Sequence, residues 1–283
     1  MLPAFWASTS ALLIAPTAVT RISQKVFIED TDAYGVVYHA NYLRFFERAA
    51  TAECLGCGCI GLVSVDAMRY STAAVLGDEC IVECAPTSGD SSSCSAALIR
   101  TSDARELCSA SGLRLARLGH GFEATENDAR LEAELIPAVC DAPLLDPSGG
   151  SLRLHYDEAS CAGSLSLHAV ARYFERHRTT FLGGPTRLAE LAATGVNVVV
   201  ARIKGLRLLP AAHEIAAGTP LELRCRLSLK ARNTQVVFEQ WLLDGNTLKP
   251  LARGDVVCLC ISAESQKIIA VPQFLLHELQ IWM

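Results

Sequence analysis

The sequence has few charged residues and no excess of basic ones. Only 19% of its 283 residues are charged, and 25 Lys and Arg against 30 Asp and Glu give a formal net charge of −5. Proteins that bind nucleic acids neutralise phosphates with clustered Lys and Arg, so we expect no nucleic-acid partner. Hydrophobic residues make up 51% of the chain, which excludes disorder as its main state.

Long apolar runs are also missing. No stretch approaches the roughly 20 apolar residues that a membrane-spanning helix needs, so we expect no membrane span.

Residues 1–21 lack acidic residues and are rich in Ala, Ser and Thr, which is typical either of an organellar transit peptide or of a disordered tail. Twelve Cys lie in apolar contexts, as reduced buried thiols do. These features predict an intracellular protein, either cytoplasmic or organellar.

One eight-residue segment occurs twice. Arg44–Thr51 (RFFERAAT) returns as Arg172–Thr179 (RYFERHRT), at an offset of 172 − 44 = 128 residues. Strand-like segments that contain Gly112 and Gly254 follow in the same order at the larger offset of 254 − 112 = 142. A repeated segment followed by a matching order of elements predicts an internal duplication.

The growing offset means that the second copy carries extra residues. They fit best at Gly183–Val200, where the first copy has only the short segment Leu55–Gly61. The duplication divides the chain into a leader (1–21), a first repeat (22–120), a linker (121–150), a second repeat (151–262) and a C-terminal tail (263–283). We expect a short helix at Asp128–Leu135 in the linker and a docked helix in the apolar tail, with an oligomer contact as the alternative for the tail.

Each copy predicts one helix among several strands. In the first helix Leu43, Phe46 and Ala50 share one face. One helix followed by antiparallel strands is an α+β unit, with the apolar face of the sheet wrapped around the helix. The expected strands are Lys25–Glu29, Ile81–Cys84, Ser95–Arg100, Leu107–Leu115, Leu152–Tyr156, Val196–Ile203, Leu221–Ser228, Val236–Leu243 and Asp255–Ile261.

A long motif precedes the first helix. The stretch from Asp30 to Tyr42 reads Asp-Thr-Asp-Ala-Tyr-Gly-Val-Val-Tyr-His-Ala-Asn-Tyr. It resembles the motif Asp-x-Asp-x-x-Gly-Val-Val-Tyr-His-x-Asn-Tyr of the 4-hydroxybenzoyl-CoA thioesterase-like branch of the hotdog-fold superfamily, and Leu76–Glu79 resembles that family's turn before its second strand. The resemblance implies a tandem hotdog, in which two repeats form within one chain what the family usually makes as a dimer.

By this resemblance Asp32 is the catalytic carboxylate, acting as a general base on water or as a nucleophile. The backbone near His39 polarises the thioester carbonyl, because a helix N-terminus has unsatisfied N–H groups and a partial positive charge. The side chain of His39 either positions water or only packs. A close turn at Gly35 fits a residue without Cβ.

The other residues of the motif have supporting roles. The residues expected to line the substrate are Gly35, Val36, Val37, Tyr38 and Asn41, and Asn41 is expected to cap the helix as well. Asp30 is expected to stabilise a turn, and Glu47 to be exposed or ion-paired.

The second copy departs from the motif. At the offset of 128, Asp32 corresponds to Ser160, His39 to Leu167 and Asn41 to Ala169. We expect the second site to be inactive and the second repeat to wall the first site. A small slip in the alignment that brings Asp157 or Glu158 to the position of Asp32 is the alternative.

Two further clusters suggest other chemistry. Cys54, Cys57 and Cys59 lack a second pair of ligands for structural zinc, so we expect no metal. Arg202, Lys204 and Arg207 lie at strand spacing, either as a solvated sheet face or as a surface for the phosphates of coenzyme A or for an acidic carrier protein.

The sequence and the resemblance together predict a hydrolase of acyl-CoA or acyl-carrier-protein thioesters that needs no cofactor and that forms a homo-oligomer of double hotdogs. Two alternatives stay open. One is a hydratase or dehydratase on the same fold, and the other is a non-catalytic acyl-binding or scaffolding protein.

Overall fold

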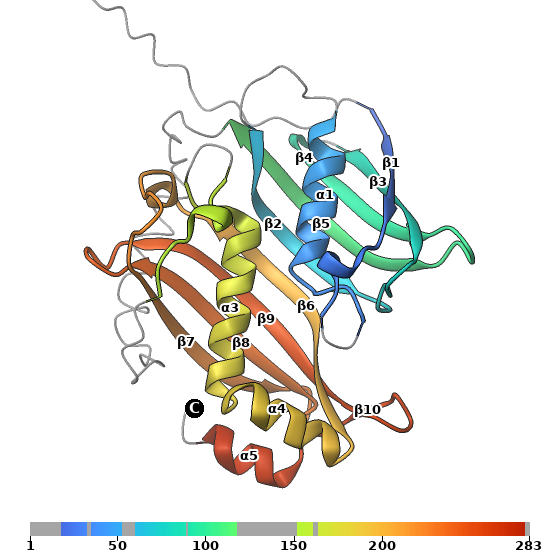
Figure 1. The fold of residues 1–283 in the computed structure, drawn as a ribbon, viewed down its shortest axis with the longest axis vertical. Coiled ribbons are helices and arrows are strands. Elements are labelled where there is room, and N and C mark those ends of the chain that lie inside the picture. Colours follow the sequence, from blue (N-terminus) through green and yellow to red (C-terminus); the bar gives the residue numbers. More distant parts are fainter. Residues whose placement is uncertain are drawn as a thin grey trace, which may run out of the picture.

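The computed structural model describes residues 18–32, 35–52, 60–88, 90–117, 152–160 and 164–280. These residues form one antiparallel sheet that carries two central helices on one side (Figure 1). The helices are α1 (Asn41–Thr51), α3 (Leu167–Phe181), α4 (Gly184–Ala193) and α5 (Gln273–Gln280). The strands are β1 (Thr20–Lys25), β2 (Ile60–Tyr70), β3 (Glu79–Thr87), β4 (Asp90–Arg100), β5 (Glu106–Arg117), β6 (Val196–Leu208), β7 (Leu221–Lys230), β8 (Gln235–Asp244), β9 (Pro250–Ser262) and β10 (Ile268–Ile269).

The strand order is β1-β3-β4-β5-β2-β6-β9-β8-β7, with β10 paired to β9. Outward from the β2–β6 junction, the series β2, β5, β4, β3 on one side is repeated as β6, β9, β8, β7 on the other. A single bridge between Arg153 and Pro220 takes the place that β1 holds in the first half. This symmetry about the junction confirms the internal duplication and the α+β tandem architecture.

The structure also fixes the alignment of the two repeats. Short 3₁₀ turns occupy Ile28–Asp30 and Tyr156–Glu158, which lie 128 residues apart. The bridge between Thr31 and Val37 returns at the same offset as the bridge between Ala159 and Leu165. No slip is needed, so Ser160 corresponds to Asp32.

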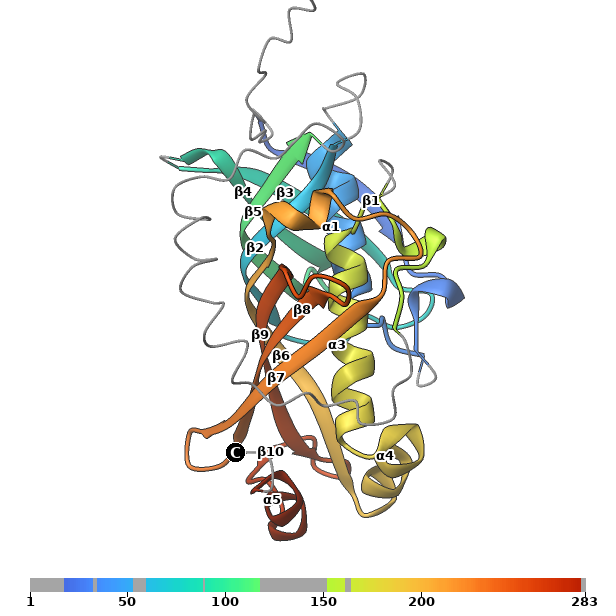
Figure 2. The same cartoon turned by 90° about the vertical axis from the view of Figure 1, so that its left-hand side faces the viewer.

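Helix α4 lies in the extra residues of the second repeat. Gly183 precedes it with φ of +92°, a left-handed conformation that suits glycine, and Pro185 follows in the first turn of the helix. Leu191 of this helix is buried. Figure 2 shows α4 next to the C-terminal end of α3, as the insertion predicted from the growing offset requires.

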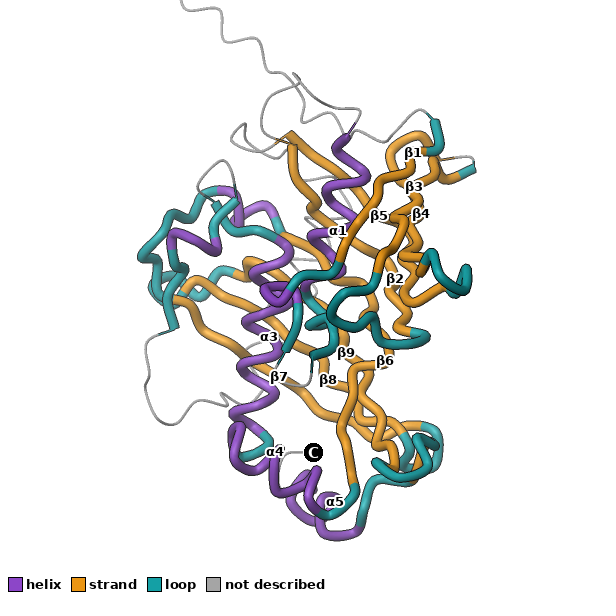
Figure 3. Tube along the Cα trace, turned by 45° about the vertical axis from the view of Figure 1, so that its right-hand side comes forward, coloured by secondary structure: helices purple, strands orange, loops and turns teal. Residues whose placement is uncertain are grey.

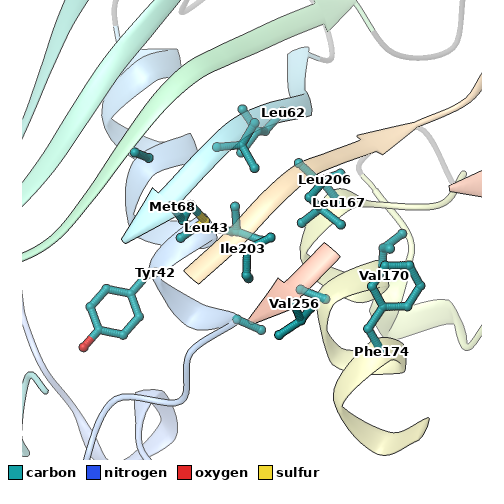
Figure 4. Close-up of a cluster of buried hydrophobic side chains, with 14 of the residues drawn as sticks. Tyr42, Leu43, Leu62, Met68, Leu167, Val170, Phe174, Ile203, Leu206 and Val256 are labelled. Carbon is teal, nitrogen blue, oxygen red and sulfur yellow. The ribbon is translucent and has the colours of Figure 1, made fainter. Parts of the chain in front are cut away.

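A single apolar core joins the two repeats. Helices α1 and α3 contact each other, and Figure 3 shows both against the sheet. In Figure 4, Leu43 and Met68 of the first repeat lie close to Ile203 and Val256 of the second. All four side chains belong to one buried cluster. The two repeats therefore share one apolar core.

Several expectations need correction. The strand expected at Lys25–Glu29 is wrong in position, because β1 ends at Lys25 and a 3₁₀ turn follows. Leu152–Tyr156 forms only the bridge at Arg153 instead of a strand. Strand β2, which forms the junction, was not predicted at all. The remaining expected strands are confirmed within β3 to β9.

The expected C-terminal helix is confirmed as α5, which buries Leu275 and Leu279. The described cysteines are free and buried, as expected for reduced thiols. The cysteines at 54, 57 and 59, the linker 121–150 and most of the leader lie outside the described residues. No helix in the described part of the chain is both long and apolar enough to cross a membrane.

Candidate active site

The motif folds into a tight hairpin that leads into α1. The N–H of Asp32 donates to the carbonyl of Val36 at 2.9 Å, and the N–H of Gly35 donates to the carbonyl of Asp32 at 3.0 Å. Gly35 has φ of +72°, so the expected need for glycine at this turn is confirmed. Asp32 is half-buried at the hairpin, and Ala33 and Tyr34 lie outside the described residues.

Asp30 is buried beneath the hairpin. Its Oδ2 accepts a hydrogen bond from the backbone N–H of Phe27 at 3.1 Å, and Asp30 as a whole is only 2% exposed. The carbonyl of Asp30 accepts the N–H of Tyr38 at 3.0 Å. This geometry confirms the turn-stabilising role expected for Asp30 and leaves Asp32 as the more accessible carboxylate of the pair.

The two valines of the motif differ in position. Val37 is 5% exposed, and its N–H donates to the carbonyl of Ala74, so it belongs to the core. Val36 is half-buried and forms a bridge with Val75. The turn at Leu76–Glu79 is confirmed: the N–H of Leu76 donates to the carbonyl of Gly35, and β3 begins at Glu79.

Asn41 does not cap α1, contrary to expectation. The cap position is Ala40, and Asn41 is the first residue of the helix. The Asn41 amide donates to the carbonyl of Asp30 at 2.9 Å, and its Oδ1 lies 3.0 Å from Nε2 of His168 on α3. Asn41 therefore links the motif of the first repeat to the central helix of the second.

His39 lies at the start of α1 and faces α3. Its Nε2 is 3.8 Å from Oε2 of Glu175 and 3.4 Å from Nη2 of Arg178. The hydroxyl of Tyr70 donates to the His39 carbonyl at 3.0 Å, and the Tyr38 ring lies 4.7 Å from the imidazole, centroid to centroid. Both faces of the motif are thus fixed, one by β2 and the other by the second repeat.

Burial keeps His39 neutral. Burial lowers the pKa of His39 to about 4; Glu175 raises it and Arg178 lowers it further. Burial alone would raise the pKa of Glu175, but the charge of Arg178, together with His39 and hydrogen bonds from Arg178 and Thr179, brings it to about 2. At neutral pH a neutral imidazole therefore lies beside a carboxylate and a guanidinium.

Arg178 is held rigidly in the second repeat. It is 3% exposed, and it donates to Glu175 and, through Nη1, to Oε1 of Gln240 at 2.6 Å. The Gln240 amide in turn donates to the carbonyl of Phe174 at 3.0 Å. Because Gln240 and Phe174 are buried and Glu175 is fixed on α3, the guanidinium presents a fixed positive charge to His39.

A cavity of about 40 Å³ opens beside this cluster. Glu175, Arg178 and Thr179 form its polar part. The rest is apolar and comes from α3, α4 and the sheet of the second repeat: Leu182, Leu188, Val198, Val200, Phe238 and Cys258. The cavity thus has a charged end, formed by residues that contact His39, and an apolar interior, but its volume has room only for a few water molecules and is far below that of an ordinary ligand site.

The corresponding place in the other half is different. Glu47 is the counterpart of Glu175, but it is half-buried and its Oε1 accepts the N–H of Leu62 at 2.7 Å, which corrects its expected placement as an exposed or ion-paired residue. Leu167 replaces His39 and is buried. Ser160, in place of Asp32, has its hydroxyl 3.0 Å from that of Ser164. The second motif thus lacks both the acid and the imidazole of the first.

Sequence reasoning missed Glu175 and Arg178 as site residues. The signal was present in the repeated octapeptide, where Glu175 aligns with Glu47 but Arg178 aligns with Ala50. Of these two residues only Arg178 differs between the copies, so a difference at one position of the repeated segment was the available signal. Among the described residues, no group of three or more His, Cys, Asp or Glu is arranged to hold a metal ion.

Residues 34–108 match the family model of the thioesterase superfamily. The matched segment covers the second half of the motif, α1 and the strands through the first part of β5, and so includes His39 but not Asp32.

Curated relatives match over short segments of the chain. The acyl-CoA thioesterase YbgC of Haemophilus influenzae is 74% identical over 27 residues, which are 10% of this chain and 20% of that protein. The acyl-CoA thioester hydrolase YbgC of Escherichia coli O6:H1 is 57% identical over 35 residues, or 12% and 26% of the two chains. The chain thus spans about a fifth to a quarter of the length of these relatives.

Solved structures match nearly the whole chain and show its fold. The 12:0-ACP thioesterase from Umbellularia californica matches with a TM-score of 0.55 and 11% identity, over 86% of this chain and 94% of that one. The dehydratase domain of PpsC from Mycobacterium tuberculosis matches with a TM-score of 0.50 and 14% identity, over 89% and 98%. Since the neighbours include both a thioesterase and a dehydratase, the fold leaves the reaction undecided.

Proposed function

We propose that the protein hydrolyses acyl thioesters, with Asp32 as general base or nucleophile at a site that the second repeat completes. The observation that carries the proposal is the cluster of His39, Glu175 and Arg178, which joins the thioesterase motif of one repeat to an apolar cavity of the other. The thioester carbonyl lies at the polar end of that cavity, which must widen to admit an acyl chain.

In the base mechanism Asp32 accepts a proton from water, and the resulting hydroxide adds to the carbonyl carbon. The tetrahedral oxyanion then collapses, the carbon–sulfur bond breaks, and the leaving thiolate takes the proton from Asp32. The products are a free acid and a free thiol. In the nucleophile mechanism the Asp32 carboxylate attacks the carbonyl carbon instead, and the carbon–sulfur bond breaks to release the thiolate and leave a mixed anhydride. Water then hydrolyses this anhydride to the free acid and the Asp32 carboxylate, and the proton released from water converts the thiolate to the thiol.

The N-terminus of α1 supports the charge that develops on the oxygen. The first N–H groups of a helix carry no intrahelical partner and have a partial positive charge. His39 and Ala40 directly precede this helix. A carbonyl oxygen held there gains most when it becomes an oxyanion, which lowers the barrier to the addition step.

Neutral His39 fits a positioning role better than a role as a cation. With its pKa near 4, the imidazole stays uncharged at neutral pH and can hold a water or the acyl group through one ring nitrogen. Arg178 supplies the fixed positive charge at the polar end of the cavity.

Thiol release from benzoyl, short-chain and long-chain acyl-CoAs, read with a disulfide reagent, tests the proposal. Wild type and Asp32→Asn are compared, with Ser160→Ala as the matched variant of the second repeat. We expect Asp32→Asn to lower the rate by at least about 100-fold, and Ser160→Ala to leave it within a factor of two. A large loss in Ser160→Ala contradicts the model of one active site.

The same assay separates the alternatives. If no acyl-CoA releases thiol, acyl-carrier-protein thioesters are tested next. If neither class of thioester releases thiol, the result contradicts hydrolysis and favours an acyl-binding protein. Hydration of an enoyl thioester without thiol release indicates the dehydratase alternative, which the structural likeness to the PpsC domain raises.

A further inference from the structure

A second and larger cavity lies on the face of the sheet opposite the helices. Its volume is about 410 Å³, within the ordinary range of small-molecule sites. Arg69 of β2 and Arg202 and Lys204 of β6 line it. Because side chains alternate along a strand, and Met68 and Ile203 point into the core, Arg69 and Arg202 point to the helix-free face. We call this cavity the basic groove.

The two arginines are direct neighbours across the junction of the repeats. Arg69 pairs with Arg202 in the register of β2 and β6. Like charges placed opposite one another destabilise a sheet. No ion pair joins either arginine to a carboxylate within the described part of the chain, whereas Lys204 is opposite Asp255 on β9. An anion bound between the arginines removes this repulsion.

Arginine favours one kind of anion. Its planar guanidinium binds phosphate oxygens through two parallel hydrogen bonds, and two guanidinium groups on neighbouring strands can contact one phosphate or two linked ones. The groove also carries hydroxyl and amide groups, from Ser71, Thr234 and Gln235. No carboxylate lines the groove among the described residues.

One wall of the groove is apolar. Val257 and Leu259 of β9 and Ile268 of β10 form it, and Ile268 is 58% exposed. An exposed isoleucine beside paired arginines suits a ligand with a flat apolar ring and phosphates. A polynucleotide fits poorly, because the basic residues are confined to one concavity of a chain with a net charge of −5.

We propose that the basic groove binds a nucleotide, with its phosphates between Arg69 and Arg202 and its base against Val257, Leu259 and Ile268. Neither the thioesterase motif nor the cavity beside Glu175 contributes a residue to this site.

The groove lies close to the candidate active site through the sheet. Tyr70 follows Arg69 and points to the opposite face, where its hydroxyl donates to the His39 carbonyl. On the N-terminal side of Arg202, β6 has no β2 partner among the described residues. Val198 and Val200 lie in this part of the strand and line the cavity beside Glu175. If the proposed function holds, a thioester whose carrier ends in a nucleotide can bind the nucleotide in the groove. The rest of the carrier then extends past this part of β6 to the other face of the sheet and places its sulfur near His39.

Calorimetric titration of the full chain with adenosine 3′,5′-bisphosphate tests the nucleotide site directly. Adenosine and inorganic phosphate are the two partial ligands. We expect the bisphosphate to bind at least tenfold more tightly than either, with an affinity that falls as salt rises. Equal binding of phosphate and bisphosphate contradicts a nucleotide site, and so does equal binding of adenosine.

Variants then locate the site. Arg69→Ser/Arg202→Ser is expected to raise the Kd of the bisphosphate at least tenfold. The control Arg21→Ser/Arg187→Ser removes the same charge from β1 and α4, where both side chains pair with glutamates, and it should leave the Kd within twofold. An equal loss of affinity in the control overturns the proposal, since it shows an effect of net charge alone.

The bisphosphate contains no thioester, so its binding does not depend on hydrolysis. Asp32→Asn should bind it as wild type does. Failure to bind in a folded wild-type chain therefore counts against the groove alone, and absence of thiol release counts against the hydrolase alone.

Discussion

His39 of the first repeat and Glu175 of the second lie 3.8 Å apart, between Nε2 and Oε2, although 136 positions separate them in the sequence. The hairpin of the motif brings His39 to the start of α1, and the packing of α1 against α3 brings Glu175 to it. Neither repeat contains both groups. A single chain thus reaches, through duplication, a site composed of two repeats.

The carboxylate of Glu175 can be tested with an internal control. We expect Glu175→Gln to lower kcat/KM at least tenfold, a loss of about 1.4 kcal/mol of transition-state stabilisation. The reason is that Glu175 orders Arg178 and Thr179 around His39. Glu47→Gln changes the equivalent residue of the other repeat, whose Oε1 accepts the N–H of Leu62, and should leave kcat/KM nearly unchanged.

A positioning role predicts more than a loss of rate. In Glu175→Gln the loss should fall mainly on kcat, and the acid limb of the pH–rate profile should move, because the charge beside His39 has changed. Glu175→Asp should restore part of the rate. Equal effects of Glu175→Gln and Glu47→Gln, with both variants folded, argue that the two glutamates serve only the structure.

Leu188 of α4 lines the cavity beside Glu175, to which the proposed function assigns the acyl chain. Leu188→Ala enlarges the cavity and should shift the preference towards longer acyl chains. Each additional methylene that the cavity buries is worth about 0.8 kcal/mol, or about fourfold in kcat/KM. The measurement is kcat/KM across acyl-CoAs that differ by two carbons.

The matched control is Leu191→Ala, which truncates a buried leucine of the same helix that does not line the cavity. It should lower stability without changing the ranking of chain lengths. An unchanged ranking in Leu188→Ala, or the same shift in both variants, places the acyl chain elsewhere.

The motif and the duplication could be predicted because they depend on local sequence. The turn at Gly35, where the structure has φ of +72°, and the helix repeated at the offset of 128 both follow from the sequence without knowledge of any tertiary contact. Strand β2 escaped prediction because a bulge between Leu62 and Ser64 breaks its alternation. Leu62 and Val63 are consecutive and both buried, so the two-residue period of a strand is lost there.

The contacts of His39 could not be predicted in the same way. They depend on how α1 packs against α3, which no periodicity in either repeat specifies. The misplacement of Asn41 as a cap has the same cause: its preference for helix starts is real, but the neighbouring carbonyl of Asp30 and the ring of His168 compete for its side chain. Tertiary partners decided its role.

Asn41 should matter for stability because it joins the repeats. In Asn41→Ala the carbonyl of Asp30 and Nε2 of His168 each lose a hydrogen bond, which costs about 1–3 kcal/mol of the free energy of unfolding. Urea unfolding measures this loss. Asn246→Ala, in the exposed turn after β8, should change stability by less than about 0.5 kcal/mol. A large loss of activity in Asn41→Ala without a loss of stability assigns Asn41 to the substrate instead.

Buried neutral histidines predict a stability that falls in mild acid. Burial lowers the pKa of His39 to about 4 and, together with Arg44, Arg172 and His39, that of His168 to about 3. The unfolded chain therefore takes up protons near pH 6.5, before the folded chain does, and stability decreases as pH falls from about 6.5 towards 4.

Glu175 adds to the loss at lower pH. Its folded pKa of about 2 lies below the ordinary value of 4.5, so its stabilisation is present above pH 4.5 and is lost as pH falls towards 2. The histidine contribution is separable, because His168→Gln keeps a donor for Asn41 but cannot be protonated. Its slope of stability against pH between 6.5 and 4.5 should be shallower than that of wild type, by up to about 1.4 kcal/mol per pH unit. Identical slopes in the two proteins show that His168 is not buried as a neutral group.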